Sequence, residues 1–260
     1  MAQCPVSGKQ LPQGDPNAPA QCPVTGQFAD GSRPAQVLTT QQQKDGVRYT
    51  LIGIPFSTFT RTLAMGLHEL GLTFSQISDA APHSEHVPRQ YSPFGKIPVL
   101  LLQHGDKTFG MSETASIARF LDAGSRPLLR FAESERIKNQ KLEEMISMTG
   151  DAVFASIEGG IVKPYLKNNK TEDVTQEALD NLSKTLEILT NACHGPYIYG
   201  MAITWADLFL YPILADLSAT PFASELVKFD KLQKWLIRMG KRDAAVKTRQ
   251  GTLEGGASPP

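Results

Sequence analysis

The sequence predicts a small α/β domain followed by an all-helical domain, and two patterns support this expectation. Between residues 46 and 124, short apolar runs with strand character alternate with helical spacing, in the order β-α-β and then β-β-α. From about Ser134 to Ala245 the apolar residues follow a helical period, and no convincing strand interrupts them. We therefore expect one domain over 46–124 and a second, all-helical domain over 134–246.

Turn-forming residues mark the ends of the elements in the first domain. A strand over 49–53 is stopped by Gly53 and Pro55. A helix over 61–70, with its leucines on one face, ends at Gly71. Further strands are expected at 72–77, 97–102 and around 108–111, and a second helix at 113–121.

The two ends of the chain differ from the body in composition. Residues 1–45 hold six of the 18 prolines and a single aromatic residue, so we expect a disordered or strap-like N-terminal extension. Within it, CPVSG at 4–8 recurs as CPVTG at 22–26, a pattern typical of a duplicated turn, with a redox or metal role of the cysteines as the alternative. Residues 247–260 are polar and rich in glycine and proline, which predicts a flexible C-terminal tail.

Charge and composition exclude several classes of function. The 26 basic residues balance the 26 acidic ones, so we expect no nucleic-acid partner. No run of 18 apolar residues is present and the N-terminus lacks a secretory pattern, so we expect a soluble cytoplasmic protein without a membrane partner. Three scattered cysteines predict no disulfide framework, and we expect no metal.

Three segments of the first domain combine turn, hydroxyl and acidic residues. They are GIPFSTFTR at 53–61, SPFGKIPVL at 92–100 and MSETASIARFL at 111–121. Each also has a purely structural interpretation: the hydroxyls of the first segment suit a helix N-cap, Pro98 suits the start of a strand, and Glu113 suits the positive end of a helix dipole.

The second domain carries an independent pattern, YGMAITWADL at 199–208. The spacing of Thr204 and Asp207 predicts a capping box, in which each side chain bonds to the backbone amide of the other residue. The apolar run Leu208–Leu214 then predicts a core helix, and KLQKW at 231–235 a later one.

Taken together and in this order, these segments resemble the glutathione transferase superfamily. That family has a thioredoxin-like domain with a strand, a Ser/Tyr/Cys turn and a helix, then an N-P-x-G-[KQ]-[VI]-P-x-L loop and an E-S-x-A-I helix. Its helical domain carries a G-x-x-x-[ST]-x-A-D stretch and an L-x-x-W helix. Here Ser92 stands for the asparagine, Thr114 for the serine and Ser116 for the alanine. The resemblance covers about residues 48–246 and is to a serine-type, fungal-like member with an N-terminal extension.

The resemblance implies a glutathione site in the first domain. Glu113 would take the ammonium of the γ-glutamyl head, and the Thr114 hydroxyl and amide its carboxylate. Ile97, before a proline that is cis in the family (Pro98), would pair with the cysteinyl backbone as an added strand does. Lys96 would help with a carboxylate, and the loop 83–90 would reach the glycine end.

The resemblance also implies how the thiol is activated. Ser57 stands where serine-type members carry the activating hydroxyl, with Thr58, Thr60 or a backbone amide as alternatives and Tyr49 ranked lower. No cysteine occupies the turn, which disfavours the cysteine-type members that act through mixed disulfides. Candidates for the electrophile pocket, each of which could instead be a core residue, are Phe56, Phe59, Met145, Met148, Phe154 and Tyr211.

The function that the resemblance implies is a cytoplasmic, homodimeric glutathione transferase acting in detoxification. It would conjugate the thiolate of glutathione, as co-substrate, to a hydrophobic electrophile. Two alternatives remain: a glutathione-dependent lyase or isomerase on the same scaffold, and a non-catalytic ligand-binding or regulatory protein. A thioredoxin-like redox protein is disfavoured because the chain has no C-x-x-C motif.

Overall fold

We analysed a computed structural model of the 260-residue chain, which describes residues 46–123, 128–132 and 134–259. The chain forms two compact units that divide between Leu121 and Asp122. The N-terminal extension over 1–45, with its repeated Cys-Pro-Val motif, lies outside the described residues. Each unit is described by itself below.

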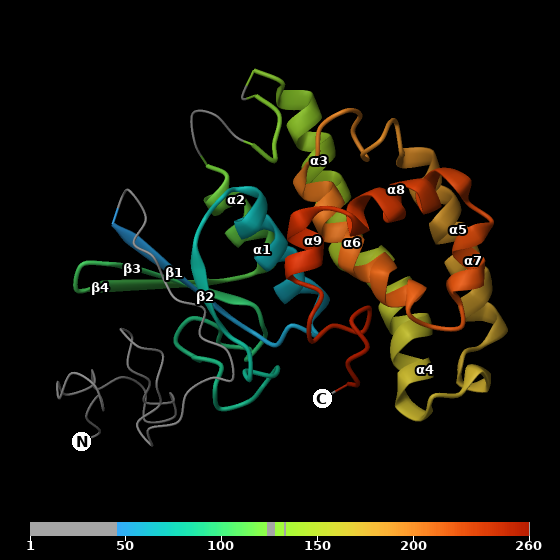
Figure 1. Cartoon of the computed structure of the whole chain (residues 1–260), viewed down its shortest axis with the longest axis horizontal. Helices are drawn as coiled ribbons and strands as arrows, with labels where there is room; N and C mark the ends of the chain where they lie inside the picture. The colour runs from blue at the N-terminus through green and yellow to red at the C-terminus, as the bar shows by residue number, and fades with distance from the viewer. Residues whose placement is uncertain (1–45, 124–127, 133, 260) are drawn as a thin grey trace. The chain divides into compact units, whose positions relative to one another are not determined.

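The first unit is a four-stranded mixed sheet with two helices (Figure 1). The strands are β1 (Val47–Ile52), β2 (Phe74–Ile77), β3 (Val99–His104) and β4 (Lys107–Ser112), in the order β2-β1-β3-β4. β1 pairs with β2 in parallel, and the β1–β3 and β3–β4 pairs are antiparallel. With α1 (Thr58–Glu69) and α2 (Thr114–Leu121), this gives the predicted order β-α-β and β-β-α.

Helix α1 begins three residues earlier than the apolar spacing indicated. Ser57 has an extended backbone, and its hydroxyl accepts a hydrogen bond from the Thr60 amide at 3.3 Å, which caps the helix. The helix buries Leu63, Met65 and Leu67. The helix ends at Glu69, and Gly71, which follows the C-cap residue Leu70, has the positive φ of 67° typical of the residue after a helix end.

The long connection between β2 and β3 supplies part of the core. Ala80 and Val87 from this loop are fully buried against Ile52, Ile77 and Val99 of the strands. The loop therefore contributes buried apolar side chains that pack against the sheet.

The second unit is helical, as predicted. Its elements are α3 (Arg136–Met148), the π-helical turns η1 (Thr149–Val153) and η2 (Ala155–Val162), α4 (Lys163–Asn168), the 3₁₀ turn η3 (Thr171–Asp173), α5 (Gln176–Ala192), α6 (Trp205–Ser218), α7 (Ala223–Val227), α8 (Asp230–Gly240) and α9 (Asp243–Lys247). Among its described residues the β pairing is limited to one isolated bridge, between Tyr197 and Gly200.

Helix α6 is the centre of this unit, and nearly all of its residues are buried. It begins with the predicted capping box: the Thr204 amide donates to the Asp207 carboxylate at 2.8 Å. The same carboxylate accepts from the Ile198 amide at 2.9 Å and from Trp235 Nε1 at 2.8 Å. Burial raises the pKa of Asp207 despite these bonds. The motif thus ties the start of α6 to α8 and to the preceding loop.

The continuous helical segment Arg136–Asn168 is long and apolar enough to cross a membrane by length and composition alone. Of its most apolar window, 44% is buried inside the structure. A core helix of a helical domain passes the same test, so this segment carries no argument for a membrane.

The end of the chain differs from the flexible tail predicted over 247–260. Lys247 ends α9, and the described residues after it form hydrogen-bonded turns: the Thr252 amide donates to Arg249 at 3.2 Å and the Gly255 amide to Thr252 at 3.0 Å. Thr252 is buried. Glycine and small polar residues are as typical of tight turns as of frayed ends, so composition alone could not separate the two.

Candidate functional site

The strand register brings the three segments singled out in the sequence to one edge of the sheet. Ile52, the last residue of β1, lies opposite Val99, the first residue of β3. Val99 in turn lies opposite Ser112, the last residue of β4. The turn after β1, the loop before β3 and the residues after β4 therefore meet side by side.

Gly53 allows the first segment to approach the second. Its φ is +149°, and a Cβ built on it would lie 2.4 Å from Thr60 Oγ1 and 3.3 Å from Ile97 Cβ. Only glycine fits such a position without displacing its neighbours. The start of α1 thereby lies against the loop that enters β3.

Ser57 lies at the N-terminus of α1, and its hydroxyl oxygen is already occupied by the Thr60 amide. Its hydroxyl proton is then available to donate to a group above the helix N-terminus, where the helix dipole also favours negative charge. Ser57 is partly exposed, whereas Thr58 and Thr60 are buried. Among the three hydroxyls proposed for thiol activation, Ser57 is thus the accessible one.

The second segment, 92–98, is held by its own hydrogen bonds. The buried Ser92 hydroxyl donates to the Lys96 carbonyl at 2.8 Å, and the Gly95 amide donates to the Ser92 carbonyl at 2.8 Å. The Ile97–Pro98 peptide bond is cis. The Lys96 side chain is exposed and Ile97 is partly exposed, so both can reach a ligand at this edge.

Glu113 has a backbone conformation that L-residues rarely adopt, with a φ of 70°. Its carbonyl accepts from the Ile117 amide at 3.0 Å, so the residue stands at the entry to α2, and its side chain is exposed. Such conformations cost about 1–3 kcal/mol and concentrate at functional sites. Thr114 follows as the first residue of α2, where backbone amides lack partners within the helix.

The loop 83–90, expected at the glycine end of glutathione, contributes Arg89. Its guanidinium group donates to the His83 carbonyl at 3.3 Å and to the Pro93 carbonyl at 3.4 Å. A Cβ on Gly95 would lie 2.2 Å from Arg89 Nη1, so the guanidinium packs directly on that glycine. This arginine connects the loop to the second segment, a link that sequence spacing could not reveal.

The six candidates for an electrophile pocket divide between the two units. Phe56 and Phe59 belong to the first unit, and the other four to the second. Met145 is buried and Met148 is 38% exposed, at the end of α3. Lys163 Nζ lies 4.5 Å from the centroid of the Phe154 ring, and Tyr211 is buried in the core of the helical unit. Their shared pocket stays a prediction.

The described residues include no cluster of three or more His, Cys, Asp or Glu side chains that could hold a metal ion. The three segments at this edge offer hydroxyl, amide, ammonium and carboxylate groups, from Ser57, the backbone, Lys96 and Glu113. Such a set suits a small zwitterionic ligand, with Glu113 for a cationic group and helix N-termini for anionic ones.

A thioredoxin-like sheet unit followed by a helical unit defines a class of glutathione-binding folds, and comparisons with known proteins agree. The family model described as glutathione S-transferase, N-terminal domain, matches residues 56–123, and that for the C-terminal domain matches residues 159–247. Glutathione S-transferase 4 of Zea mays is 25% identical over 214 residues, covering 80% of this chain and 94% of the relative.

Solved structures show the same fold. Glutathione transferase F7 from Populus trichocarpa superposes with a TM-score of 0.64 at 22% identity, covering 78% of this chain and 98% of that one. A glutathione transferase family member from Pseudomonas fluorescens, solved with two glutathione bound, superposes with a TM-score of 0.62 at 19% identity. The match covers 80% of this chain and 92% of that one. The chain belongs to the glutathione transferase superfamily.

Proposed function

We propose that the protein is a glutathione transferase of the serine type, which conjugates the thiolate of glutathione to a hydrophobic electrophile. The observation that carries the proposal is the convergence of Ser57, Ile97 and Glu113 at one edge of the sheet. The superfamily membership and the glutathione bound to the Pseudomonas relative support it. A soluble, cytoplasmic homodimer is part of the same proposal, carried over from the resemblance.

In this proposal Glu113 binds the ammonium of the γ-glutamyl head, and Thr114 binds the adjacent carboxylate with its hydroxyl and amide. Ile97 pairs with the cysteinyl backbone next to Pro98, and Lys96 supports a carboxylate. The left-handed backbone of Glu113 supports this assignment, because such strained conformations concentrate at functional sites.

Ser57 then stabilises the thiolate. A free thiol has a pKa of about 8.5, and lowering it by two units takes about 2.7 kcal/mol of preference for the ionised form. A hydroxyl donor together with the amides at the N-terminus of α1 favours the thiolate over the neutral thiol. The thiol proton is released to solvent, the thiolate forms a bond from its sulfur to the electrophilic carbon, and the leaving group departs with the electron pair of the broken bond.

The test is the pH dependence of turnover in Ser57→Ala. We expect glutathione affinity to be nearly unchanged and turnover near neutral pH to fall about 10- to 100-fold. The rate should recover partly at high pH, where the thiol ionises unaided. Superimposed pH–rate profiles of the two proteins would show that Ser57 only caps α1.

Thr175 provides the matched control. It caps α5 through the same kind of bond, from the Ala178 amide to its hydroxyl at 3.2 Å. Thr175→Ala therefore reports the effect of a lost cap alone, about 1 kcal/mol of stability, and should leave turnover unchanged.

A second variant tests the binding half of the proposal. Glu113→Ala should weaken glutathione binding about 10- to 100-fold, because a charged hydrogen bond to the ammonium is lost. Tight glutathione binding without turnover on a range of electrophiles, in the unmodified protein, would instead favour a non-catalytic binder. Turnover by elimination or isomerisation would favour a lyase or isomerase.

A further inference from the structure

The basic residues of the chain are concentrated toward its C-terminal end, which the overall balance of charge conceals. Between residues 228 and 249 the sequence has eight lysines and arginines against two acidic residues, a net charge of +6. Since the whole chain has a net charge of zero, the rest of it carries −6. The basic stretch forms α8, α9 and the segments that flank them.

Four of these cations form a stripe along the outer side of α8, which we call the basic stripe. Its members, all exposed, are Lys231, Lys234, Arg238 and Lys241. They follow one another at intervals of three or four residues, which places them on one side of a helix with 3.6 residues per turn. The buried residues of α8, on its opposite side, are Leu232, Trp235 and Met239. The helix is therefore held by its apolar side and presents its basic side to solvent.

The basic stripe keeps most of its charge. Lys234 Nζ lies 2.7 Å from Asp230 Oδ2, but both side chains are exposed, and such a surface pair is weak. Arg238 donates from Nη1 to the Pro196 carbonyl at 2.8 Å, which fixes the guanidinium group without neutralising it. Lys231 and Lys241 form no ion pair with a described residue. The stripe therefore attracts anions.

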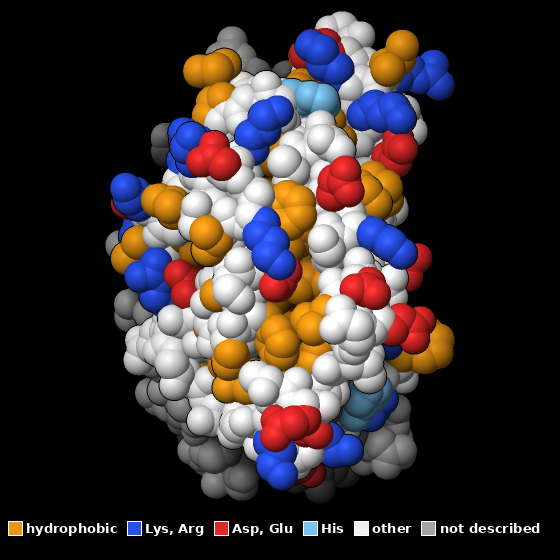
Figure 2. All heavy atoms as spheres, turned by 90° about the vertical axis from the view of Figure 1, so that its right-hand side faces the viewer, with side chains coloured by type: hydrophobic (Ala, Val, Ile, Leu, Met, Phe, Trp, Pro, Cys, Tyr) orange, Lys and Arg blue, Asp and Glu red, His pale blue; other side chains and the backbone are white. Residues whose placement is uncertain are grey.

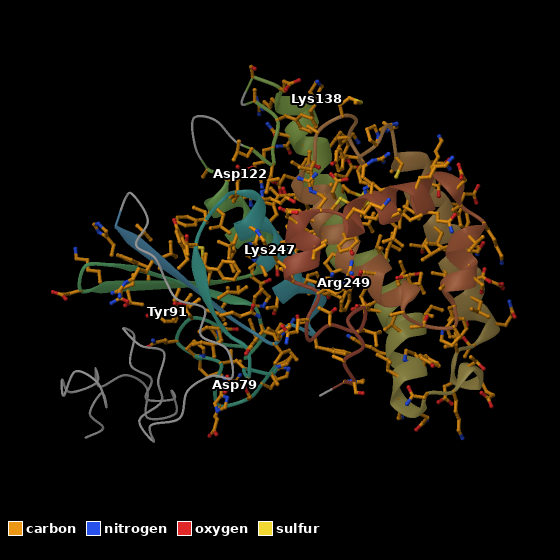
Figure 3. All side chains as sticks on the ribbon, viewed as in Figure 1. Asp79, Tyr91, Asp122, Lys138, Lys247 and Arg249 are labelled. Carbon is orange, nitrogen blue, oxygen red and sulfur yellow. The ribbon has the colours of Figure 1, made fainter. Side chains whose placement is uncertain are left out.

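The surface around the stripe is apolar in places. Ile237 on α8 is 53% exposed and lies beside the stripe, three residues after Lys234 and four before Lys241. On α9, Val246 is 54% exposed, and Lys247, labelled in Figure 3, is exposed next to it in the sequence. Figure 2, which faces the side where α5 and α7 lie in Figure 1, shows basic and apolar side chains next to one another along its left edge. Cations mixed with exposed apolar side chains suit the boundary of a bilayer, where anionic headgroups meet acyl chains.

The composition of the stripe favours lipid over nucleic acid. Three of its four cations are lysines, whose compact, hydrated ammonium groups suit a diffuse anionic surface, whereas arginine is preferred for bidentate recognition of nucleic acids. Neither aromatic residue of the stretch 228–249, Phe229 or Trp235, is exposed, so this face offers no platform on which bases could stack.

We propose that this face of the helical unit, centred on the basic stripe, docks reversibly on membranes that contain anionic lipids. The cations lie among the headgroups, and Ile237 reaches the boundary with the acyl chains. The expectation of no membrane partner rested on the overall charge and on the lack of a spanning segment, and neither tests for a local charge on a folded surface. None of the residues proposed for glutathione belongs to this face, so the inference does not depend on the proposed function.

The experiment is flotation of the full chain with two kinds of vesicle, phosphatidylcholine alone and phosphatidylcholine with about 30% phosphatidylserine. At about 0.1 M salt the chain should bind the mixed vesicles about 10-fold or more tightly than the neutral ones. At about 1 M salt, where the Debye length falls to about 3 Å, this preference should be lost.

Two triple variants that remove the same charge from different places separate the stripe from the overall charge. Binding to the mixed vesicles should weaken about 10- to 100-fold in the variant of the stripe, Lys231→Gln, Lys234→Gln and Arg238→Gln. It should weaken less than about 2-fold in the control variant of exposed lysines elsewhere in the helical unit, Lys167→Gln, Lys170→Gln and Lys184→Gln. All six side chains are exposed, and thermal unfolding checks that both variants are folded.

A second pair of variants tests the apolar contribution. Ile237→Gln should weaken binding to the mixed vesicles about 3-fold or more, because its side chain no longer gains from leaving water. Ile137→Gln is the control, since Ile137 is 80% exposed on α3, outside the basic stretch.

Four results would overturn the proposal. They are equal binding to the two kinds of vesicle, a preference that survives high salt, equal losses in the two triple variants, and undiminished binding by Ile237→Gln. Binding to single-stranded polyuridylate that is tighter than binding to the mixed vesicles would show that nucleic acid is the partner instead.

Discussion

Replacing Glu158 with glutamine should remove a large pH dependence of stability. Glu158 lies on η2 and is 4% exposed, and its carboxyl group is hydrogen-bonded to that of Asp216 on α6, which is 5% exposed. The Lys163 ammonium is the nearby cation that opposes protonation. The hydrogen bond with Asp216 also lowers the pKa of Glu158, so burial, which disfavours the charged carboxylate, is the cause that raises it.

Burial raises the pKa of Glu158 from its ordinary 4.5 to about 7. The folded protein therefore keeps a proton that the unfolded chain has released. The stabilisation is complete below about pH 4.5 and is lost as the pH rises through 7. At about 1.4 kcal/mol per pH unit, the interval between the two values corresponds to about 3 kcal/mol.

The assay is urea unfolding of the native chain and Glu158→Gln at intervals from pH 5 to pH 8.5. Glutamine mimics the protonated acid, so the two proteins should be similar at pH 5, and the variant should be more stable by up to about 3 kcal/mol at pH 8. Lys163→Gln should move the loss to higher pH, because it removes the cation that favours the carboxylate. Glu187→Gln, on the exposed face of α5, is the control. Parallel pH profiles of the native chain and Glu158→Gln would refute the reasoning.

Three further predictions follow from local geometry. Gly53→Ala should destabilise the protein by about 1–3 kcal/mol, measured by urea unfolding, because the added Cβ would clash with Thr60. Gly71→Ala is the control: nothing lies within 4 Å of the added Cβ, so this change should cost only the strain of the positive φ. Asp207→Ala should lower the free energy of unfolding by about 3 kcal/mol or more, because several buried donors lose their acceptor. A loss of less than about 1 kcal/mol would contradict this. Burial raises the pKa of Cys193 to about 11, so in a chain with Cys4 and Cys22 replaced by serine, a disulfide reagent at pH 8 should label the protein only after unfolding.

The order of elements in the first unit was predictable because each strand and helix ends at a residue with a clear local signal. Gly53 and Gly71 stop elements in both the sequence and the structure. The capping box of Thr204 and Asp207 is equally local, since its partners lie three residues apart. What sequence spacing could not supply is the third partner of that carboxylate, Trp235, which comes from a helix 28 residues later.

The sequence allowed the three segments of the candidate site, 53–61, 92–100 and 111–121, to be identified. Only the pairing of β1, β3 and β4 shows why these segments lie side by side. Apolar alternation indicates that β1, β3 and β4 exist but not their register, which depends on long-range hydrogen bonds. The left-handed backbone of Glu113 carried no signal either, because glutamate has no special preference for that conformation. Likewise, the contact of Glu158 with Asp216 joins residues far apart in the sequence, and each alone resembles a solvated acid.

The turn between β3 and β4 has a consequence for evolution and engineering at the opposite end of the hairpin. Gly105 and Asp106 form a two-residue connection in which His104 faces Lys107, and Gly105 has a φ of 57°. Six residues of each strand, about 20 Å, separate this turn from the edge where Pro98 and Glu113 lie together. A single residue inserted in the exposed turn would slide one strand against the other by about 3.4 Å and reverse the faces of its side chains. The length of this surface turn therefore sets the register at the opposite end of the hairpin, where Pro98 and Glu113 lie.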